Sequence, residues 1–364
     1  MNLNWNFDRT LLIGTLCLLA FGLMMVFSAS TPISGDKFQS PHFLFYRQLA
    51  WAGVGLVVFL AAIHLKMRWL ANGWTLLAGL LGTYGLLGLV FLQSPINGTH
   101  RWVHAFGVAF QPSELAKFMT IFFLSWYLSR TTDLRSRPLL HLGRILAVLL
   151  PMLGLIAMEP DLGSVVLILL ITGLYLFLAD FPIKLLAVGA MAAIPALLVM
   201  VLTSSYQLQR IKTFLNPLAD PQGRGYQILQ SLIAIGHSGF WGLGFGESSQ
   251  KMFFLPEPHT DFIYAVVGEE LGFIGCAVLT ALFVTLFVRG IRASTHSPTP
   301  MHCWLGMGLC ALIMIEALIN TSMVVNLGPT KGIPLPFVST GGTSLLMSLL
   351  AMGLVTNISR EAEE

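Results

Sequence analysis

Long, continuous runs of apolar residues separated by short polar segments extend along almost the whole chain. A membrane-spanning helix takes about 20 residues, and we predict such a helix in each of ten runs. Because the runs are continuous rather than apolar at every second residue, they favour helices over the strands of a membrane β-barrel. The predicted spans are 11–30, 49–65, 74–92, 115–128, 145–158, 162–178, 185–202, 262–288, 303–325 and 344–355.

The composition of the chain fits a protein embedded in lipid. Hydrophobic residues make up 55% of the chain and charged residues only 10%, against roughly 25% charged residues in an ordinary soluble domain. The mean hydropathy is +0.77, and the net charge of +3 is small. These values exclude a soluble enzyme, a disordered chain and a nucleic-acid-binding protein. We therefore predict an all-α polytopic membrane protein in which residues 1–364 form one transmembrane domain.

The basic residues predict the orientation of the bundle. Ten spans place both termini on one side, and with that side inside, 11 of the 20 Lys and Arg residues face inward and nine outward. This modest bias, densest in the short loop 130–144, favours N-in and C-in. The outer connections are longer, and the largest, 203–260, is predicted to be an extracytoplasmic loop between the seventh and eighth helices. We therefore expect the function to reside on the outer face.

The large outer loop contains two segments with a pattern of their own. Residues 226–235 have the spacing of an amphipathic helix, which we predict to lie in the outer membrane interface. The following run, Gly236-His-Ser-Gly-Phe-Trp-Gly-Leu-Gly-Phe-Gly246, predicts an irregular and closely packed loop. Arg210, Lys212 and Arg224 give the outer loop a basic edge.

A cluster of carboxylates surrounds the start of the eighth predicted helix. Asp261 follows Pro-Glu-Pro-His259-Thr at the beginning of this helix. A carboxylate there can cap the helix, or it can act as a general base at the membrane boundary, where partial desolvation raises its pKa. Glu269 and Glu270 lie about two turns deeper. Such buried carboxylates either brace the bundle or support the chemistry of Asp261.

Cations near the outer boundary form a second set of candidates. Arg101 and Lys117 flank the helix-start motif Gln111-Pro-Ser-Glu114. They can anchor the helix ends at the interface, or they can hold an anionic group such as a pyrophosphate. Lys331 is a further candidate, in the Pro- and Gly-rich segment 328–342. That segment is predicted to be non-helical, so at membrane depth it must line protein or a wet cavity.

Two smaller groups have both a structural and a chemical interpretation. Glu159-Pro-Asp161-Leu-Gly163 lies in the tight outer turn between the fifth and sixth spans. Its carboxylates can cap the next helix, or they can bind a cation that faces phosphates. Glu316 and Asn320 are four residues apart on one face of the ninth helix, where interhelical hydrogen bonds are the simpler interpretation.

In their order and spacing these clusters resemble the SEDS family, the polytopic peptidoglycan glycosyltransferases of bacterial shape, elongation, division and sporulation. The resemblance extends from about residue 28 to residue 353. Gly328-Pro-Thr-Lys331-Gly is more similar to the division branch than to the elongation branch. The chain departs from the family pattern at Thr340, where Tyr is common, and at Glu159, where Gln is frequent. It also departs at Glu316, where Gln is usual in the division branch. The motifs that carry the resemblance are Phe110-Gln-Pro-Ser-Glu-Leu-Ala-Lys117, Glu159-Pro-Asp-Leu-Gly163, Arg210 through Gln227, Leu255-Pro-Glu-Pro-His-Thr-Asp-Phe262, Gly268-Glu-Glu-Leu-Gly272 and Pro334-Leu-Pro.

The resemblance implies ten transmembrane helices and polymerisation of lipid II into β-1,4 glycan strands. An essential aspartate of the family matches Asp261, which would take the proton of the acceptor hydroxyl while undecaprenyl pyrophosphate leaves. One base without a carboxylate nucleophile implies inversion at the anomeric carbon. The substrate-binding candidates are Arg101, Lys117, Arg210, Lys331, His259 and Ser339. The supporting candidates are Glu114, Asp161, Glu269 and Glu270.

The resemblance also implies partners and a location. A class B penicillin-binding protein would crosslink the new glycan, and other divisome membrane proteins would accompany it at the septum, in the bacterial inner membrane. A divalent cation, Mg²⁺ or Mn²⁺, could share the pyrophosphate, but no metal ligands are assigned. Two alternatives remain open. A lipid II flippase should show polar residues through the membrane depth and an internal repeat, and a non-catalytic scaffold for the penicillin-binding protein would not need Asp261.

Overall fold

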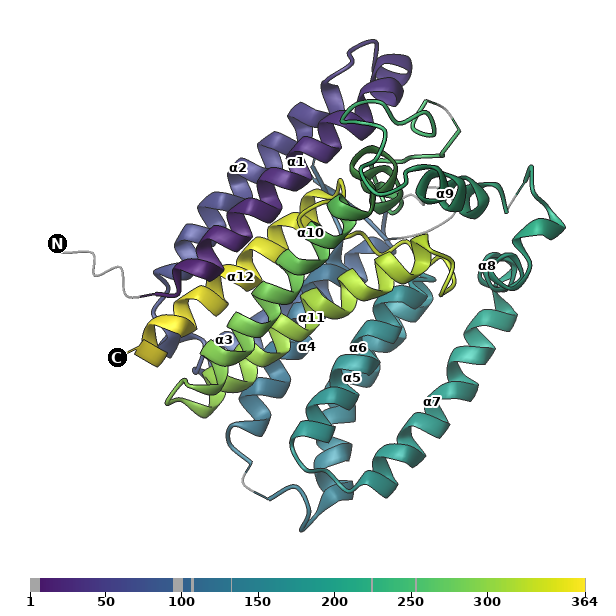
Figure 1. Ribbon diagram of the computed structural model, residues 1–364. Helices are drawn as coiled ribbons and strands as arrows, with labels where there is room; N and C mark the ends of the chain where they lie inside the picture. Colours follow the sequence, from purple (N-terminus) through teal and green to yellow (C-terminus); the bar gives the residue numbers. More distant parts are fainter. Residues whose placement is uncertain are drawn as a thin grey trace.

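The protein is a bundle of long helices, with the shorter helices α8 (Ser205–Leu215) and α9 (Tyr226–His237) at one end (Figure 1). The computed structural model describes residues 7–93, 101–105, 108–131, 133–223, 225–252 and 254–363, so Arg224 of the predicted basic edge lies outside the described residues. Each of the ten predicted spans overlaps one long helix. These helices are α1 (Arg9–Phe38), α2 (Phe43–Ile63), α3 (Gly73–Val90), α4 (Pro112–Leu128), α5 (Pro138–Met158), α6 (Leu162–Leu178), α7 (Ile183–Thr203), α10 (Ile263–Thr295), α11 (Pro300–Val324) and α12 (Gly342–Glu363).

The short elements lie in the connections between these helices. An antiparallel hairpin of β1 (Val103–Ala105) and β2 (Val108–Phe110) precedes α4, with Val103 paired to Phe110. The outer loop holds α8 (Ser205–Leu215), the 3₁₀ turn η2 (Pro217–Ala219) and α9 (Tyr226–His237), and a second 3₁₀ turn, η1 (Met67–Trp69), joins α2 to α3. The predicted amphipathic helix at 226–235 is therefore confirmed as α9, which packs against α10.

Most of the long helices satisfy the length and hydropathy expected of a membrane span. Among the described residues, eight do so, and α6 is equally apolar but 17 residues long. The helix α4 also has 17 residues, and it carries Glu114 and Lys117. The chain is thus a multi-pass membrane protein, and the crossing of the bilayer by α4 and α6 stays a prediction.

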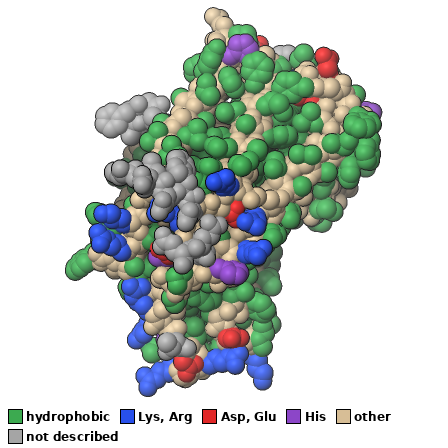
Figure 2. Space-filling view, turned by 60° about the vertical axis from the view of Figure 1, so that its left-hand side comes forward, with side chains coloured by type: hydrophobic (Ala, Val, Ile, Leu, Met, Phe, Trp, Pro, Cys, Tyr) green, Lys and Arg blue, Asp and Glu red, His purple; other side chains and the backbone are tan. Residues whose placement is uncertain are grey.

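Both described ends of the chain lie at the same end of the bundle (Figure 1). The backbone N–H of Asp8 donates to Ser359 Oγ at 3.0 Å, and Arg289 Nη2 forms an ion pair with Asp8 Oδ2 at 2.7 Å. Figure 2 shows Lys and Arg side chains over the lower part of one face and hydrophobic side chains over its upper part. The orientation with both termini inside stays a prediction, and α8 and α9 of the outer loop lie at the end opposite the termini (Figure 1).

Small residues let the central helices approach closely. A Cβ on Gly353 of α12 would lie 2.7 Å from Phe59 O of α2, so the two backbones are in direct contact there. Nearby, Asn357 Nδ2 donates to Ala62 O at 2.8 Å. In contrast, α7 lies at the edge of the bundle against α6 and α8 and buries only Val201. The close packing of the central helices holds in place the helix ends to which the outer segments are connected.

A buried ion group joins α4 to α11 at the centre of the bundle. Lys117 Nζ lies 2.8 Å from Glu114 Oε1 and also contacts Glu316 Oε1, while the Lys117 side chain is only 2% exposed. Removing one partner of a buried ion pair leaves an uncompensated charge, which costs about 3–5 kcal/mol.

We therefore expect Glu316→Ala to lower the stability of the purified protein by several kcal/mol and Glu316→Gln to lower it less, because the amide still accepts a hydrogen bond from Lys117. Thermal unfolding in detergent measures both changes. The matched control is Asp180→Asn, which removes the exposed ion pair of Asp180 with Arg135 at 3.3 Å and should cost at most about 1 kcal/mol. Equal losses for Glu316→Ala and Asp180→Asn would contradict a central role for the buried group.

Candidate functional site

Asp261 lies at the outer end of the bundle, in the irregular segment that leads into α10. The helix begins at Ile263, and its N-cap residue, Phe262, has no side-chain capping bond, so Asp261 does not serve as the cap. The half-buried Asp261 side chain lines a cavity of about 570 Å³. Other residues of this cavity are Asp36, Arg210, Gln227, Glu257, Thr330 and Gly332.

The backbone around Asp261 is held by side chains from α11 and from the segment before α12. Asn320 Nδ2 donates to Asp261 O at 2.9 Å and to Ile333 O at 2.8 Å. Ser339 Oγ donates to Thr260 O at 2.7 Å, and Thr340 Oγ1 donates to His259 O at 2.9 Å. Asn320 therefore fixes two loops rather than a neighbouring helix. Ser339 and the His259 backbone also hold the loops in place.

Arg210 of α8 faces the same point in the cavity as Asp261. Its Nη1 donates to Thr330 O at 3.0 Å, and its guanidinium lies 4.5 Å above the centre of the Tyr206 ring. Gly332 has φ +66°, and a Cβ on it would lie 3.3 Å from Asp261 Oδ2 and 3.9 Å from Arg210 Nη1. The glycine therefore keeps open the space that the two charged groups share.

The surroundings of Asp261 favour a carboxylate that can accept a proton near neutral pH. The pKa of Asp261 is raised to about 6, mainly by burial and also by Glu257, although Arg210 and Arg101 act to lower it. Burial also lowers the pKa of Arg210, although the neighbouring Asp261 favours its charged form. A base whose pKa lies just below the working pH is mostly ionised and still binds a proton effectively.

Arg101 is directed at the turn between α5 and α6. Its Nε donates to Glu159 O at 3.2 Å, and its Nη2 contacts Pro160 O, which also accepts from Gln207 Nε2 at 3.1 Å. Its positive charge still acts on Asp261 and Arg210 through space. The sequence candidate Arg101 is therefore close enough to influence the cavity, but its donors bind backbone carbonyls.

Asp161 caps α6, which confirms the structural interpretation of this carboxylate. It accepts from Ser164 N at 3.3 Å and from Ser164 Oγ at 2.7 Å, and Ser113 Oγ of α4 donates to it at 3.0 Å. These bonds connect the start of α6 to the start of α4. Asp161 thus supports the turn that Arg101 binds.

The two predicted lysines do not join Asp261 in the cavity lining. Lys117 is held by Glu114 and Glu316 inside the bundle, where its charge is already compensated. Lys331 is half-buried between two residues that line the cavity, and burial lowers the pKa of its ammonium group. Lys331 makes no ion pair with any described residue, so its charge remains available to an anion.

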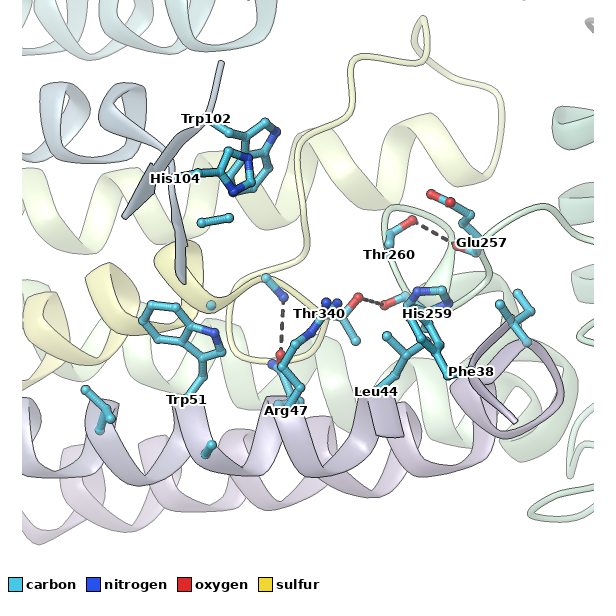
Figure 3. Close-up of a pocket in the computed structure, with 17 residues that line it drawn as sticks. Phe38, Leu44, Arg47, Trp51, Trp102, His104, Glu257, His259, Thr260 and Thr340 are labelled. Atoms are coloured by element: carbon cyan, nitrogen blue, oxygen red, sulfur yellow. Dashed lines mark hydrogen bonds between the residues drawn. The ribbon is translucent and has the colours of Figure 1, made fainter. Parts of the chain in front are cut away.

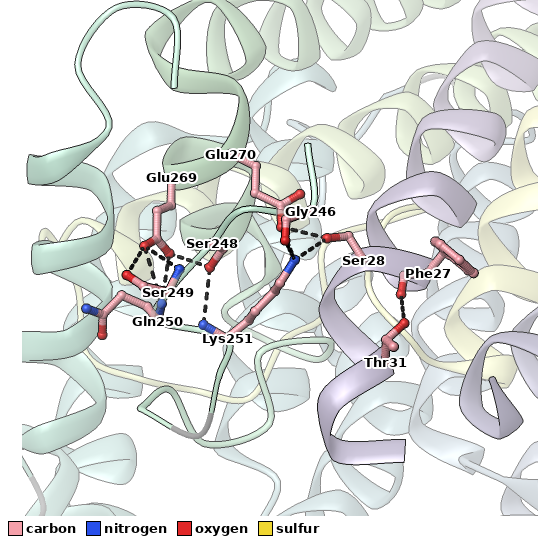
Figure 4. Close-up of polar contacts among 10 residues, drawn as sticks. All are labelled: Phe27, Ser28, Thr31, Gly246, Ser248, Ser249, Gln250, Lys251, Glu269 and Glu270. Atoms are coloured by element: carbon pink, nitrogen blue, oxygen red, sulfur yellow. Dashed lines mark hydrogen bonds and ion pairs between the residues drawn. The ribbon is translucent and has the colours of Figure 1, made fainter. Parts of the chain in front are cut away.

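Glu269 and Glu270 at the start of α10 fasten the outer loop to the bundle (Figure 4). Glu269 accepts from Ser249 N at 3.1 Å and from Ser249 Oγ at 2.9 Å, and it also contacts Ser248 Oγ. Glu270 forms an ion pair with Lys251 at 2.7 Å, and Ser28 Oγ of α1 donates to it at 2.6 Å. Both predicted supporting residues are therefore braces, which is one of the two interpretations that the sequence left open.

A second cavity, of about 930 Å³, adjoins the first and shares Glu257 and Thr260 with it. Figure 3 shows Trp51 and Arg47 of α2 on one side of this cavity, and on another side Trp102, which precedes β1, and His104 of β1. Leu44, Val54 and His259 also line it. Sequence reasoning gave no role to these aromatic residues, because they come from distant segments and form no local motif.

The described residues do not offer a ligand set for a divalent cation. Among them, no group of three or more His, Cys, Asp or Glu side chains is arranged to hold a metal ion. Asp36, Glu257 and Asp261 line one cavity without converging on a common point of that kind. We therefore assign no metal ligands and derive no chemical step from a metal.

Glu159 is a buried carboxyl group with no hydrogen bond to either of its oxygens from the described residues. Its pKa is raised to about 8, mainly by burial and also by the neighbouring Asp161, although Arg101 acts to lower it. In the unfolded chain a glutamate ionises near pH 4.5. The folded state therefore binds the proton more tightly, and stability falls as the pH rises from about 4.5 to about 8.

We expect Glu159→Gln to remove the loss of stability with rising pH, because the glutamine amide stays neutral at every pH in this range. The difference in melting temperature between variant and wild type should grow between pH 5 and pH 8 in favour of the variant and then level off. Melting curves in detergent across this range provide the measurement. Ser164→Ala is the control, and it should destabilise the protein at every one of these pH values because it removes an uncharged donor to Asp161, the cap of α6. A pH-independent effect of Glu159→Gln would show that Glu159 is ionised in the folded protein.

Comparison with known proteins identifies the family. Residues 9–364 match the family described as cell cycle protein, of FtsW, RodA and SpoVE. A probable peptidoglycan glycosyltransferase FtsW from Trichlorobacter lovleyi is 39% identical, over 97% of this chain and 93% of the relative. The stage V sporulation protein E of Bacillus subtilis is 36% identical, over 97% of each chain.

Solved structures agree with this assignment. A chain in a peptidoglycan synthase complex that coordinates polymerization and crosslinking has a TM-score of 0.78 and 27% identity, with 98% of each chain covered. The rod shape determining protein RodA of Thermus thermophilus has a TM-score of 0.71 and 25% identity, with the same coverage. The SEDS resemblance is thereby confirmed, and the chain belongs to the family of FtsW, RodA and SpoVE.

Proposed function

We propose that the chain is a peptidoglycan glycosyltransferase that polymerises lipid II at the outer face of the cytoplasmic membrane, in septal wall synthesis. One observation carries the proposal: the Asp261 carboxylate, with its pKa near 6, faces Arg210 across a shared cavity at the outer end of the bundle. The names of relatives as far apart as Trichlorobacter lovleyi and Coxiella burnetii, which are probable peptidoglycan glycosyltransferases, support it.

The chemistry needs a base and a cation close together. In the proposed step the 4-hydroxyl oxygen of the acceptor GlcNAc bonds to the anomeric carbon of the donor, and the bond from that carbon to the pyrophosphate breaks. Asp261 takes the hydroxyl proton, and the bonding electrons leave with undecaprenyl pyrophosphate. Because no second carboxylate is assigned as a nucleophile, the transfer inverts the anomeric carbon and gives a β-1,4 linkage.

Arg210 is the residue best placed to bind the leaving pyrophosphate. It lines the cavity beside Asp261, and a guanidinium suits phosphate oxygens. Lys331 is the second candidate because its half-buried ammonium group has no ion-pair partner among the described residues. Arg101 acts on the site through its positive charge, since its Nε and Nη2 donate to the carbonyl oxygens of Glu159 and Pro160. Lys117 is left out of the proposed binding site, because Glu114 and Glu316 already neutralise it.

The second cavity suits a substrate that is part sugar and part lipid. Its walls are mainly apolar, and Val54 on its α2 side is 51% exposed on the surface of the bundle. A polyprenyl chain could therefore remain in the membrane while the head group reaches Asp261 through the shared wall at Glu257 and Thr260. Trp51 and Trp102 offer aromatic faces to a sugar ring on the way.

We also propose a class B penicillin-binding protein as partner, together with other divisome membrane proteins. The similar chain in a complex that couples polymerization to crosslinking supports a crosslinking partner. Activity should therefore be measured in the presence of the cognate synthase.

The first test of the proposal is polymerisation of labelled lipid II by the chain and its cognate synthase, with crosslinking inhibited. Asp261→Asn should lower the rate by about 10²–10⁴-fold, because an amide cannot take the hydroxyl proton. The matched control is Glu247→Gln, which alters an exposed carboxylate of the outer loop. The wild-type rate should rise with pH through about 6, as Asp261 loses its proton.

Three outcomes would overturn parts of this proposal. Equal glycan ladders from wild type and Asp261→Asn would exclude Asp261 as the base. Lipid II movement in sealed vesicles without any ladder would favour a flippase. Synthase binding and stimulation with neither ladder nor lipid movement would favour a scaffold.

Gly332 provides a second test, specific to the geometry of the cavity. Gly332→Ala places a Cβ 3.3 Å from Asp261 Oδ2 at a positive φ, and we expect about a tenfold or greater loss of polymerisation. Gly328→Ala is the control in the same segment, because a Cβ there meets no atom within 4 Å. Rates and melting temperatures of both variants provide the measurement. Equal rates for the two would contradict the proposed arrangement of Asp261 and Arg210.

A further inference from the structure

The helix α10 is interrupted near its outer end, and a loop is bonded into the interruption. Gly272 has the non-helical angles φ 65° and ψ −162°. On one side of the break, Leu243 N donates to Glu269 O at 2.9 Å and Gly244 N donates to Glu270 O at 3.0 Å. On the other side, Phe273 N donates to Gly239 O at 3.2 Å. We call residues 239–246 the inserted loop.

The inserted loop cannot move away from α10 without breaking these contacts. A Cβ on Gly242 would lie 2.3 Å from Glu270 O, and a Cβ on Gly272 would lie 2.3 Å from Gly242 N. Both glycines have positive φ, so the two backbones meet at a point where no side chain fits. The predicted irregular and closely packed loop is thus confirmed, and its backbone is held rigidly.

The side chains of the inserted loop point away from the protein. Phe240 is 61% exposed, Trp241 78%, Leu243 48% and Phe245 45%. Phe240 contacts Phe273 of α10 with ring centres 5.3 Å apart, and Phe273 is itself 61% exposed. The loop and the helix therefore share one continuous apolar patch, which the bonded backbone prevents from collapsing into the protein.

The length of α10 gives the level of this patch relative to the membrane. Residues 273–292 rise about 29 Å at 1.5 Å per residue, and the hydrocarbon core of a bilayer is about 30 Å thick. Arg289 and Arg292 mark the inner end of this stretch. The exposed apolar residues Val278, Val284 and Val288 lie between the two ends. Phe273 and the inserted loop therefore lie at the outer boundary of the membrane.

We propose that the inserted loop is a lipid-binding site, whose Phe240, Trp241, Leu243 and Phe245 side chains enter the outer leaflet between head groups and acyl chains. The patch continues the lipid-facing surface of α10, which is why lipid is the occupant. Aromatic residues are enriched at this level of membrane proteins. The irregular backbone is compatible with lipid because its polar groups are bonded to α10.

Anchoring the loop in lipid has a consequence for Asp261. The inserted loop continues directly into Ser248, Ser249 and Lys251, which Glu269 and Glu270 hold, and from there into the segment that ends at Asp261. The loop thus sets the height of this segment relative to the membrane surface. This inference depends on the membrane location of the chain and not on the proposed reaction.

Site-directed spin labelling in proteoliposomes tests the proposal. A nitroxide is attached in turn to Trp241→Cys and to Glu247→Cys, in a chain whose four native cysteines are replaced by alanine. Collision with oxygen, which concentrates in lipid, is compared with collision with a water-soluble nickel chelate. The logarithm of the ratio of the two should be positive at position 241 and negative at position 247. Phe245→Cys is the second site should Trp241→Cys fail to fold, and it should resemble position 241.

Two results would overturn the inference. The same nickel accessibility at positions 241 and 247 would place the inserted loop in water. Shielding of position 241 from both reagents only when the cognate synthase is present would make the patch a protein interface instead.

Discussion

One constraint governs the outer end of this protein: a backbone that leaves the helical conformation beside lipid must find hydrogen-bond partners within the protein. Three irregular segments meet there, and a buried polar side chain holds each of them. Glu269 holds residues 248–250, Asn320 holds both Asp261 and Ile333, and Asp161 holds the turn into α6. Glu269 and Asn320 are fixed on the helices α10 and α11, and Asp161 is the N-cap of α6. The irregular segments of the candidate site are therefore bonded to helices or helix ends.

The same constraint divides the charged residues into two kinds. Lys117, Lys251 and their carboxylate partners neutralise one another, so they contribute connections between helices rather than chemistry. Asp261 and Arg210 instead face a cavity, and Gly332 keeps the space between them open. Burying a charged group costs free energy unless a partner compensates it, so buried charges without a protein partner are candidates for a functional site. The charges that face a cavity therefore indicate the site better than the paired ones.

The sequence predicts the helices well because each span is a long apolar run, and the non-helical segments follow from their Pro and Gly residues. It also predicts Asp261 and Arg210, which lie in or beside recognisable motifs. It does not separate Lys117 from Lys331, because the partner Glu316 is 199 residues from Lys117 in the chain. The cavity walls formed by Trp51 and Trp102 are equally non-local, because α2 and the hairpin are brought to one cavity through α12, which packs against α2 and contacts β2.

Two departures from the family pattern place a carboxylate in the interior, and the protein avoids an uncompensated charge in a different way at each. The SEDS resemblance implies glutamine where this chain has Glu159 and, in the division branch, where it has Glu316. Glu316 is compensated by Lys117, so a charge is tolerated in the bundle. Glu159 has no hydrogen-bond donor from the described residues, and the raised pKa of about 8 means that it is protonated at neutral pH. A protonated glutamate is neutral and close to glutamine in size, so the turn beside Arg101 keeps the charge balance that the family pattern implies.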